Sequence, residues 1–214
     1  EEGDTLAHSV AVKNKKGIEL THEQPQARAA IVAFAAKGGS LLTMGGYAGV
    51  GKTTTIAESI RALGNKRKSI DFCAFTGRAS SVLRQKLEAA EVLEIGDYCG
   101  TIHGLIYKPV VKDGRVIRWK KADDIEQDLI VIDEASMVNE IIYKDLASYG
   151  TPILAVGDHG QLPPIEGKFN LMENPEIKLE TIHRQAEGNP IIKLSMMARM
   201  GIPIPHGRHG EFVV

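Results

Sequence analysis

One glycine-rich segment constrains the fold of this chain more than any other feature of its sequence. It matches the pattern G-x-x-x-x-G-K-[ST] without deviation and reads Gly46-Tyr47-Ala48-Gly49-Val50-Gly51-Lys52-Thr53. That pattern requires a strand before it and a helix after it. The apolar run 40–44 predicts the strand, and the segment 51–63 predicts the helix. We therefore expect a phosphate-binding loop in an α/β domain; a glycine-rich turn without a ligand is the alternative interpretation.

The residue types of this segment explain how it would bind phosphate. Glycines allow backbone N–H groups to turn toward phosphate oxygens, and the N-terminus of the following helix adds the positive end of its dipole. Lys52 supplies a positive charge for the outer phosphates, and the Thr53 hydroxyl suits Mg²⁺. The predicted phosphate-binding residues are Gly46, Tyr47, Ala48, Gly49, Val50, Gly51, Lys52, Thr53 and Thr54.

The rest of the chain alternates short apolar runs with helical segments. Strands are expected over 70–75, 129–132 and 152–156, and helices over 78–90, 138–148 and 191–200. A further helix is expected to begin after Thr21 as its N-cap and to end at Gly38-Gly39. This alternation predicts βαβ units, and hence a parallel sheet flanked by helices as in P-loop NTPases.

One segment interrupts the alternation. Asp113-Gly114 lies between two β-branched runs, which is the strongest short-range signal of a β-hairpin. Cations surround the single tryptophan, Trp119, and this mixture suits phosphate contact combined with base stacking. It suits equally a solvated hairpin whose lysines deter edge-to-edge pairing. The cations are Lys108, Lys112, Arg115, Arg118, Lys120 and Lys121.

Two acids follow the apolar run 129–132. Asp133 and Glu134 are therefore expected at the carboxyl edge of the sheet, where open α/β sheets bind ligands. Next to a phosphate-binding loop, Asp133 would hold Mg²⁺ and Glu134 would activate the attacking water as a general base. Taken alone, the pair is also typical of the solvated first turn of a helix.

The composition excludes several classes of protein. The chain has 214 residues, 43% of them hydrophobic and 25% charged, which argues against a disordered chain. A formal net charge of -1 provides no global positive field, so any surface for nucleic acid must be local. No apolar run approaches the ~18 residues of a membrane span, so no membrane partner is expected. The two cysteines, Cys73 and Cys99, fit a reducing compartment, and we expect a cytoplasmic location.

The order of the motifs resembles that of superfamily 1B DNA helicases, in particular their RecD-like and phage Dda-like branch. The most distinctive block is Gly157-Asp158-His159-Gly160-Gln161-Leu162-Pro163-Pro164, and His183-Arg184-Gln185-Ala186 is another. The resemblance implies an N-terminal RecA-like motor domain with a small inserted β-hairpin subdomain. It also implies that this domain binds ATP and Mg²⁺ and couples hydrolysis to 5′-to-3′ movement on single-stranded DNA.

The resemblance also implies roles for single residues. Gln24 would read the adenine edge, Gln161 would sense the γ-phosphate, and Arg184 would stabilise charge on the transferring phosphate. Simpler alternatives are a solvated Gln24, a helix-capping Thr76 and a structural His103. The implied set comprises catalytic Lys52, Glu134, Gln161 and Arg184, metal ligands Thr53 and Asp133, and DNA-binding Thr76, Arg78, His103, Arg118 and Trp119.

The same resemblance divides the chain into parts. Residues 1–19 are a tail, 20–105 and 122–200 the motor domain, 106–121 the inserted hairpin, and 201–214 the start of a connection to a second RecA-like domain. That domain's motifs do not occur in the sequence, so we expect a fragment with little ATPase and no helicase activity of its own. Two alternatives are a helicase module of a relaxase or nuclease complex, and a regulatory or scaffold domain that binds nucleotide and DNA without turnover.

Overall fold

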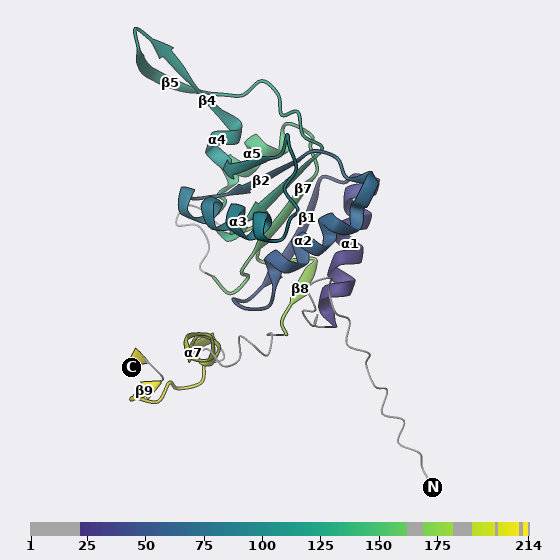
Figure 1. Cartoon of the computed structure of the whole chain (residues 1–214). Helices are drawn as coiled ribbons and strands as arrows, with labels where there is room; N and C mark the ends of the chain where they lie inside the picture. Colours follow the sequence, from purple (N-terminus) through teal and green to yellow (C-terminus); the bar gives the residue numbers. More distant parts are fainter. Residues whose placement is uncertain (1–21, 162–168, 182–189, 200, 210–211, 214) are drawn as a thin grey trace.

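The computed structural model describes residues 22–161, 169–181, 190–199, 201–209 and 212–213 (Figure 1). The strands are β1 (Leu41–Gly46), β2 (Ile70–Ala74), β3 (Tyr98–Thr101), β4 (Tyr107–Lys112), β5 (Arg115–Lys121), β6 (Leu129–Asp133), β7 (Ile153–Gly157), β8 (Ile177–Leu179), β9 (Arg208–His209) and β10 (Phe212–Val213). The helices are α1 (Glu23–Lys37), α2 (Lys52–Leu63), α3 (Gly77–Ala89), α4 (Ile102–Ile106), α5 (Glu140–Ala147) and α7 (Pro190–Arg199), with 3-10 turns η1 (Gly64–Lys66) and η2 (Ala135–Met137).

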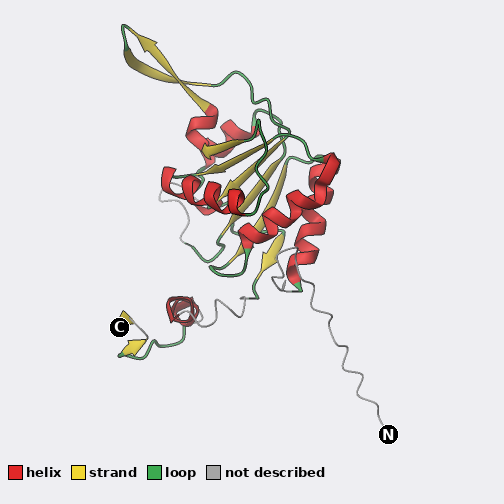
Figure 2. Ribbon diagram, in the orientation of Figure 1, coloured by secondary structure: helices red, strands yellow, loops and turns green. Residues whose placement is uncertain are grey.

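One parallel sheet organises the domain (Figure 2). Its order is β3-β2-β6-β7-β1-β8, and every neighbouring pair runs parallel. Strand β7 lies between β1 and β6, so the segments that follow these three strands leave the sheet side by side at its carboxyl edge. The predicted α/β parallel sheet is confirmed.

Helices cover both faces of the sheet. Helices α1, α2 and α3 pack on one face through side chains such as Ile31, Ile56 and Leu83. Helices α4 and α5 cover the other face through Ile102, Ile142 and their neighbours. Burial on both faces explains why β2 and β7 read as continuous runs of buried residues rather than alternating ones.

The predicted hairpin is formed by β4 and β5, which pair antiparallel and extend away from the sheet (Figure 1). Asp113 and Gly114 both have positive φ, 50° and 73°, as the tight turn of a two-residue hairpin loop requires. Residues opposite each other in such a ladder share a face, and successive residues alternate. Most of the cations are therefore separated from the tryptophan. One face carries Lys108, Lys112, Arg115, Arg118 and Lys120, and the other carries Tyr107, Pro109, Trp119 and Lys121.

Polar contacts hold the base of the hairpin against the domain. Ala122 N donates to Ile106 O over 2.8 Å, and the Tyr149 hydroxyl donates to Ala122 O over 2.9 Å. The Tyr107 hydroxyl donates to Asp145 Oδ2 on α5 over 2.5 Å. The ammonium group of Lys121 lies 5.0 Å from the centre of the Tyr149 ring. The base is thus fixed on the face of the sheet that α5 covers.

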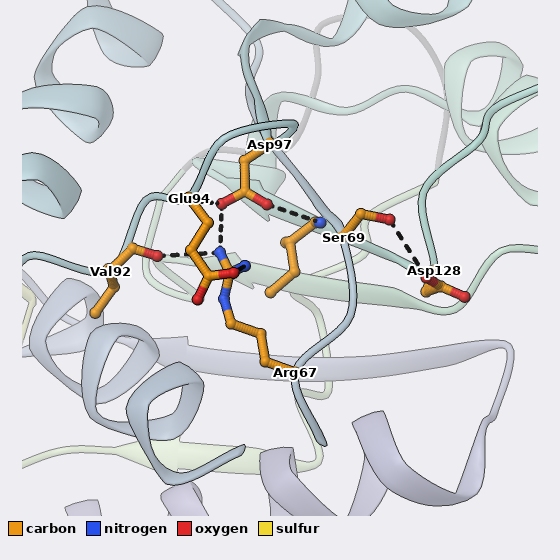
Figure 3. A network of polar contacts seen from close by, with 7 residues as sticks. Arg67, Ser69, Val92, Glu94, Asp97 and Asp128 are labelled. Atoms are coloured by element: carbon orange, nitrogen blue, oxygen red, sulfur yellow. Dashed lines mark hydrogen bonds and ion pairs between the residues drawn. The ribbon is translucent and has the colours of Figure 1, made fainter. Parts of the chain in front are cut away.

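A network of charged groups closes the amino edge of the sheet (Figure 3). The Arg67 guanidinium pairs with Asp97 and with Glu94, the latter over 2.6 Å, and donates to Val92 O over 3.1 Å. Asp97 in turn accepts hydrogen bonds from Ile70 N and Glu94 N. The side chains of Arg67 and Asp97 are only 7% and 2% exposed, so this is a buried ion pair with further hydrogen bonds.

The structure also differs from the expectations in detail. Strands β3 and β8 were not expected; β3 contains Gly100 and lies at one end of the sheet, and β8 spans only three residues. Helix α1 has His22, without a side-chain cap bond, at its N-cap position, whereas Thr21 lies outside the described residues. Within the described ranges, no helix is both long enough and apolar enough to cross a membrane.

Candidate active site

The predicted phosphate-binding loop joins the end of β1 to α2. Gly49 and Gly51 both have φ of 84°, a backbone conformation that favours glycine. A Cβ atom at Gly46 would lie 2.7 Å from Val50 Cγ2 and 2.9 Å from Leu179 O, so a larger residue would not fit there. The Lys52 ammonium donates to Gly46 O over 2.6 Å and to Tyr47 O over 3.0 Å. The loop therefore curls around its own lysine.

Helix α1 supports the first turn of α2 through Gln24. This side chain is 1% exposed, and its Nε2 donates to Gly51 O over 3.4 Å and to Thr55 Oγ1 over 3.3 Å. Thr55 Oγ1 also donates to Gly51 O over 3.0 Å. The structure thus places Gln24 next to the loop as a buried side chain, not as a solvated surface residue.

Asp133 and Glu134 stand where β6 ends. Asp133 Oδ1 accepts a hydrogen bond from Glu134 N over 3.0 Å, and Glu134 has φ of 56°, in the left-handed region. Burial raises the pKa of Asp133, against the opposing influence of the hydrogen bond and of the charges of Lys52 and Lys86. Burial and the adjacent Asp133 raise the pKa of Glu134. A raised pKa favours proton acceptance, which a general base requires.

The segment after β7 contacts the segment after β6. Ser136 in η2 donates through its hydroxyl to Gln161 Oε1 over 2.7 Å. Asp158 is buried and accepts from Gly160 N over 2.9 Å, and Gln161 N donates to Asp158 O over 3.1 Å. The turn that presents Gln161 is therefore tied to the acids through Ser136. Sequence reasoning did not assign a role to Ser136.

A ring contact that the sequence did not reveal joins this turn to the phosphate-binding loop. The rings of Tyr47 and His159 have centroids 4.5 Å apart and planes tilted by 42°. Both residues stood inside recognised motifs, but nothing in either motif indicates that the two side chains meet. The parallel register of β1 and β7, which pairs Gly45 with Gly157, brings the two following segments together.

The oxygen donors at this edge fit Mg²⁺. The Thr53 hydroxyl lies in the first turn of α2, and the Asp133 carboxylate lies close enough to Lys52 for the lysine charge to influence its pKa. Mg²⁺ prefers hard oxygen ligands and usually combines one or two protein oxygens with phosphates and water. Over the described part of the chain, no group of three or more His, Cys, Asp and Glu side chains could hold a metal ion. The arrangement therefore suits a nucleotide-borne ion rather than an all-protein site.

The residues predicted to contact DNA occupy two places. Thr76 follows β2 and caps α3 by accepting from Ala79 N over 3.2 Å, and Arg78 is exposed in the first turn of that helix. His103 is exposed after β3, with ring centroids 5.8 Å from Phe75 and 5.7 Å from Tyr107. These three residues lie at the carboxyl edge, whereas the remaining two predicted residues, Arg118 and Trp119, lie on opposite faces of the hairpin.

Two parts of the recognised motifs cannot be placed. Arg184, with the whole His183–Ala186 block, lies outside the described residues, as do Leu162 to Pro164 of the block that contains Gln161. The predicted role of Arg184 therefore stays a prediction. The structure brings together Lys52, Asp133, Glu134 and Gln161 at one edge of one sheet.

The sequence matches a family described as an AAA domain over residues 19–204. It is 32% identical over 196 residues to the ATP-dependent RecD2 DNA helicase of Deinococcus radiodurans, covering 86% of this chain and 24% of that protein. It is 33% identical over 159 residues to the RecBCD enzyme subunit RecD of Mycobacterium tuberculosis, covering 66% of this chain and 27% of that one. The chain thus spans about a quarter of the length of these relatives.

Solved structures share the fold at lower identity. The Bacteroides sp Pif1 structure in complex with ADP-AlF4 aligns with a TM-score of 0.52 at 21% identity, covering 87% of this chain and 47% of that one. A Pif1 helicase structure concerned with unwinding at forked double-stranded DNA aligns with a TM-score of 0.55 at 22% identity, covering 85% and 48%. These likenesses concern the fold, and they agree with the P-loop NTPase architecture expected from the sequence.

Proposed function

The chain belongs to the AAA domain family, and from that premise we propose that it is the first motor domain of a RecD-like DNA helicase. In this proposal it binds ATP with Mg²⁺ and couples hydrolysis to movement on single-stranded DNA. The observation that carries the proposal is the convergence at one sheet edge of three segments: the loop of Lys52, the acids after β6, and Gln161 held by Ser136. A passive nucleotide-binding module has no need of the last two.

Each residue at this edge has a distinct proposed role. Lys52 and the backbone N–H groups of its loop bind the phosphates, while Thr53 and Asp133 hold the ion, which supplies positive charge against the phosphate oxygens. Glu134 accepts the proton of the attacking water. Gln161 would sense the γ-phosphate, and Gln24, whose amide donates to Gly51 O of the loop, would read the adenine edge. Arg184 would stabilise charge on the transferring phosphate.

The proposed DNA path crosses the same edge. Arg78 and His103 are exposed there, beside the cap residue Thr76, and would contact the sugar-phosphate backbone. The hairpin would add a second contact, with phosphates on its basic face and a base stacked on Trp119, which is 64% exposed. Deleting residues Val110 to Ile117 should lower duplex unwinding more than DNA-stimulated ATP hydrolysis; equal losses would contradict this role.

The chain would act together with a further domain of the same protein. A second RecA-like domain of the same protein would complete the nucleotide site, and movement would run 5′ to 3′. Both cysteines are buried free thiols, which supports a cytoplasmic location. The helicase module of a relaxase or nuclease complex is a related alternative, and the Mycobacterium tuberculosis relative is by its name a subunit of a larger enzyme, RecBCD.

Turnover by the full-length protein tests the proposal. We expect ATP hydrolysis to rise when single-stranded DNA is added. Glu134→Gln should abolish most of that turnover while ATP affinity stays within about twofold, because the variant loses the base but not the phosphate contacts. Glu126→Gln, at an exposed position, is the matched control. A protein that binds ATP and DNA but shows no turnover that Glu134→Gln removes would instead be a scaffold.

A further inference from the structure

We propose that the ring contact between Tyr47 and His159 links the phosphate-binding loop to Gln161, so that occupation of the loop by nucleotide changes where Gln161 is held. His159 would then be a positioning residue for the proposed hydrolysis, acting through its neighbour rather than on the nucleotide. This inference rests on the proposed function and extends it to a contact between two recognised motifs that neither motif explains.

The contact is shaped by its surroundings. A Cβ atom at Gly45 would lie 2.5 Å from Pro175 Cγ and 2.9 Å from His159 Nδ1, so the histidine ring occupies the space that this glycine leaves. The ring packs on Tyr47 at 4.5 Å between centroids. Gly45 lies before the phosphate-binding pattern and is not required by it, so this packing explains why a glycine stands there.

The histidine is held by packing rather than by a hydrogen bond. In the part of the chain that the structure describes, His159 Nδ1 is buried and has no hydrogen-bond partner. A buried polar atom without a partner costs about 1–3 kcal/mol, so its presence requires an explanation. A ring whose position depends on Tyr47 and Gly45 follows those residues when they move.

The loop has a reason to move when phosphate binds. Two backbone carbonyls, Gly46 O and Tyr47 O, accept hydrogen bonds from the Lys52 ammonium. A phosphate competes for the same three N–H donors and attracts them more strongly, because its oxygens are charged. Release of Tyr47 O frees the peptide that carries the Tyr47 ring, and that ring rests on His159.

The turn after β7 transmits the displacement instead of absorbing it. Asp158, next to His159, is buried and accepts from Gly160 N, and its backbone oxygen accepts from Gln161 N. Two hydrogen bonds therefore tie the four residues of this turn together. Gln161 Oε1 in turn contacts Ser136, three residues beyond Asp133. A shift of the histidine ring thus reaches the side chain that would face the γ-phosphate.

A set of variants in the full-length protein tests the link. We expect His159→Ala to keep affinity for a fluorescent ADP analogue with Mg²⁺ within about twofold, and to lower the DNA-stimulated kcat about tenfold, within the usual range of coupling between sites. His159→Phe keeps a ring against Tyr47 and should restore most of the stimulation. In a double-mutant cycle, Tyr47→Ala combined with His159→Ala should reduce the stimulation no further than the worse single variant.

The outcomes separate the link from the proposed function. A wild-type protein without DNA-stimulated turnover overturns the proposed function itself. If wild-type stimulation is present and His159→Ala leaves it intact, the link alone is wrong. A His159→Ala variant that loses nucleotide affinity and kcat together has a structural role, as does a His159→Phe variant that fails equally, and either result overturns the link. Additive losses in the double-mutant cycle overturn it too.

Discussion

The two edges of the central sheet handle charge in opposite ways. At the amino edge, Arg67 pairs with Asp97 and Glu94 and donates to Val92 O, and Asp97 accepts from Ile70 N and Glu94 N (Figure 3). At the carboxyl edge, Asp133 and Glu134 adjoin each other, and both have raised pKa values because burial penalises their charge. At the amino edge the charged groups stabilise the fold, whereas at the carboxyl edge the acids remain suited to a ligand.

The contrast predicts which residues of this fold serve mainly stability and which serve mainly activity. Parallel strands deliver all their following segments to the carboxyl edge, so the site is built from loops there. The amino edge does not have to present these loops, so an ion pair can close it. Substitutions at the carboxyl edge should therefore lower ATP turnover, whereas substitutions at the amino edge should lower the free energy of unfolding. Four predictions test this difference, from the largest expected effect to the smallest.

The largest effect is expected at the carboxyl edge. Lys52→Ala in the full-length protein should lower ATP turnover by about 10³-fold, because a charge aimed at the transferring phosphates is lost. The free energy of unfolding should change little, since the hydrogen bonds that the lysine donates to Gly46 O and Tyr47 O are local, spanning six and five positions of the chain. Turnover assays and urea denaturation measure the two quantities side by side. Lys66→Ala, at an exposed position, is the control. A variant that unfolds as readily as it loses activity would break the contrast between the edges.

The matching change at the amino edge is Arg67→Met. It should lower the free energy of unfolding by about 3–5 kcal/mol, because it leaves Asp97 buried without its cation. Turnover per folded molecule should stay near the wild-type value. Urea denaturation followed by circular dichroism checks the first expectation. Adding Asp97→Asn to the same chain should recover part of the loss; an unchanged or larger loss in the double variant would show that the pair does not act as a unit.

The third prediction concerns Asp71, which lies in β2 just beyond the amino-edge network. It is fully buried, neither carboxylate oxygen has a hydrogen-bond partner within the described residues, and burial with the nearby Asp97 raises its pKa to about 7. Because this pKa is higher in the folded than in the unfolded chain, the contribution of Asp71 to the free energy of unfolding is greatest at low pH. This contribution falls as pH rises from about 4 to about 7 and then levels off.

The variant Asp71→Asn removes the part of the pH dependence that Asp71 contributes. It should raise the free energy of unfolding at pH 8 by about 2–4 kcal/mol and leave it nearly unchanged at pH 4. Denaturation curves at both pH values check the difference. The exposed Asp113 at the hairpin turn offers a control in Asp113→Asn, since asparagine also tolerates its positive φ. A gain of equal size at both pH values would mean that titration of Asp71 is not the cause.

The smallest expected effect concerns the Thr76 hydroxyl, which caps α3 and is predicted to lie at the DNA site. Thr76→Ala removes the cap of α3 and should destabilise the domain by about 1 kcal/mol, whereas Thr76→Ser retains the hydroxyl and should not. Affinity for single-stranded DNA, measured by fluorescence anisotropy on both variants, adds the functional readout. Loss of DNA affinity in Thr76→Ala with full recovery in Thr76→Ser would show that the hydroxyl, by capping or by contact, serves the DNA site. Unchanged affinity would leave the cap as its only role.

Local patterns account for what the sequence could predict. The phosphate-binding loop, the Asp113-Gly114 turn and the buried strands are set by short-range spacing, so the sheet class and the positions of Lys52 and Asp133 followed from the text alone. The short strand β8 could not be found in this way, because Ile177–Leu179 presents no run long enough to show a period. The strand forms because it pairs with β1, although its own sequence shows no strand pattern.

Long-range contacts account for the rest. The contact of Tyr47 with His159 depends on strand register, and the pairing of Arg67 with Asp97 joins segments 30 residues apart. No local sequence pattern predicts either contact. The hairpin illustrates a middle case: its turn was predicted, whereas the separation of Arg118 from Trp119 onto opposite faces follows from the ladder register. Sequence spacing alone suggested that these two side chains act together.

The way the hairpin is anchored has a mechanical consequence. Its strands pair with each other, while its root is pinned by Tyr107 on Asp145 and by Tyr149 on Ala122. Because Asp145 belongs to α5, a force that pulls on the Asp113-Gly114 tip would act on that helix through the root of the hairpin. Helix α5 follows η2, which carries Ser136, and strain at the tip therefore has a short route to the acids.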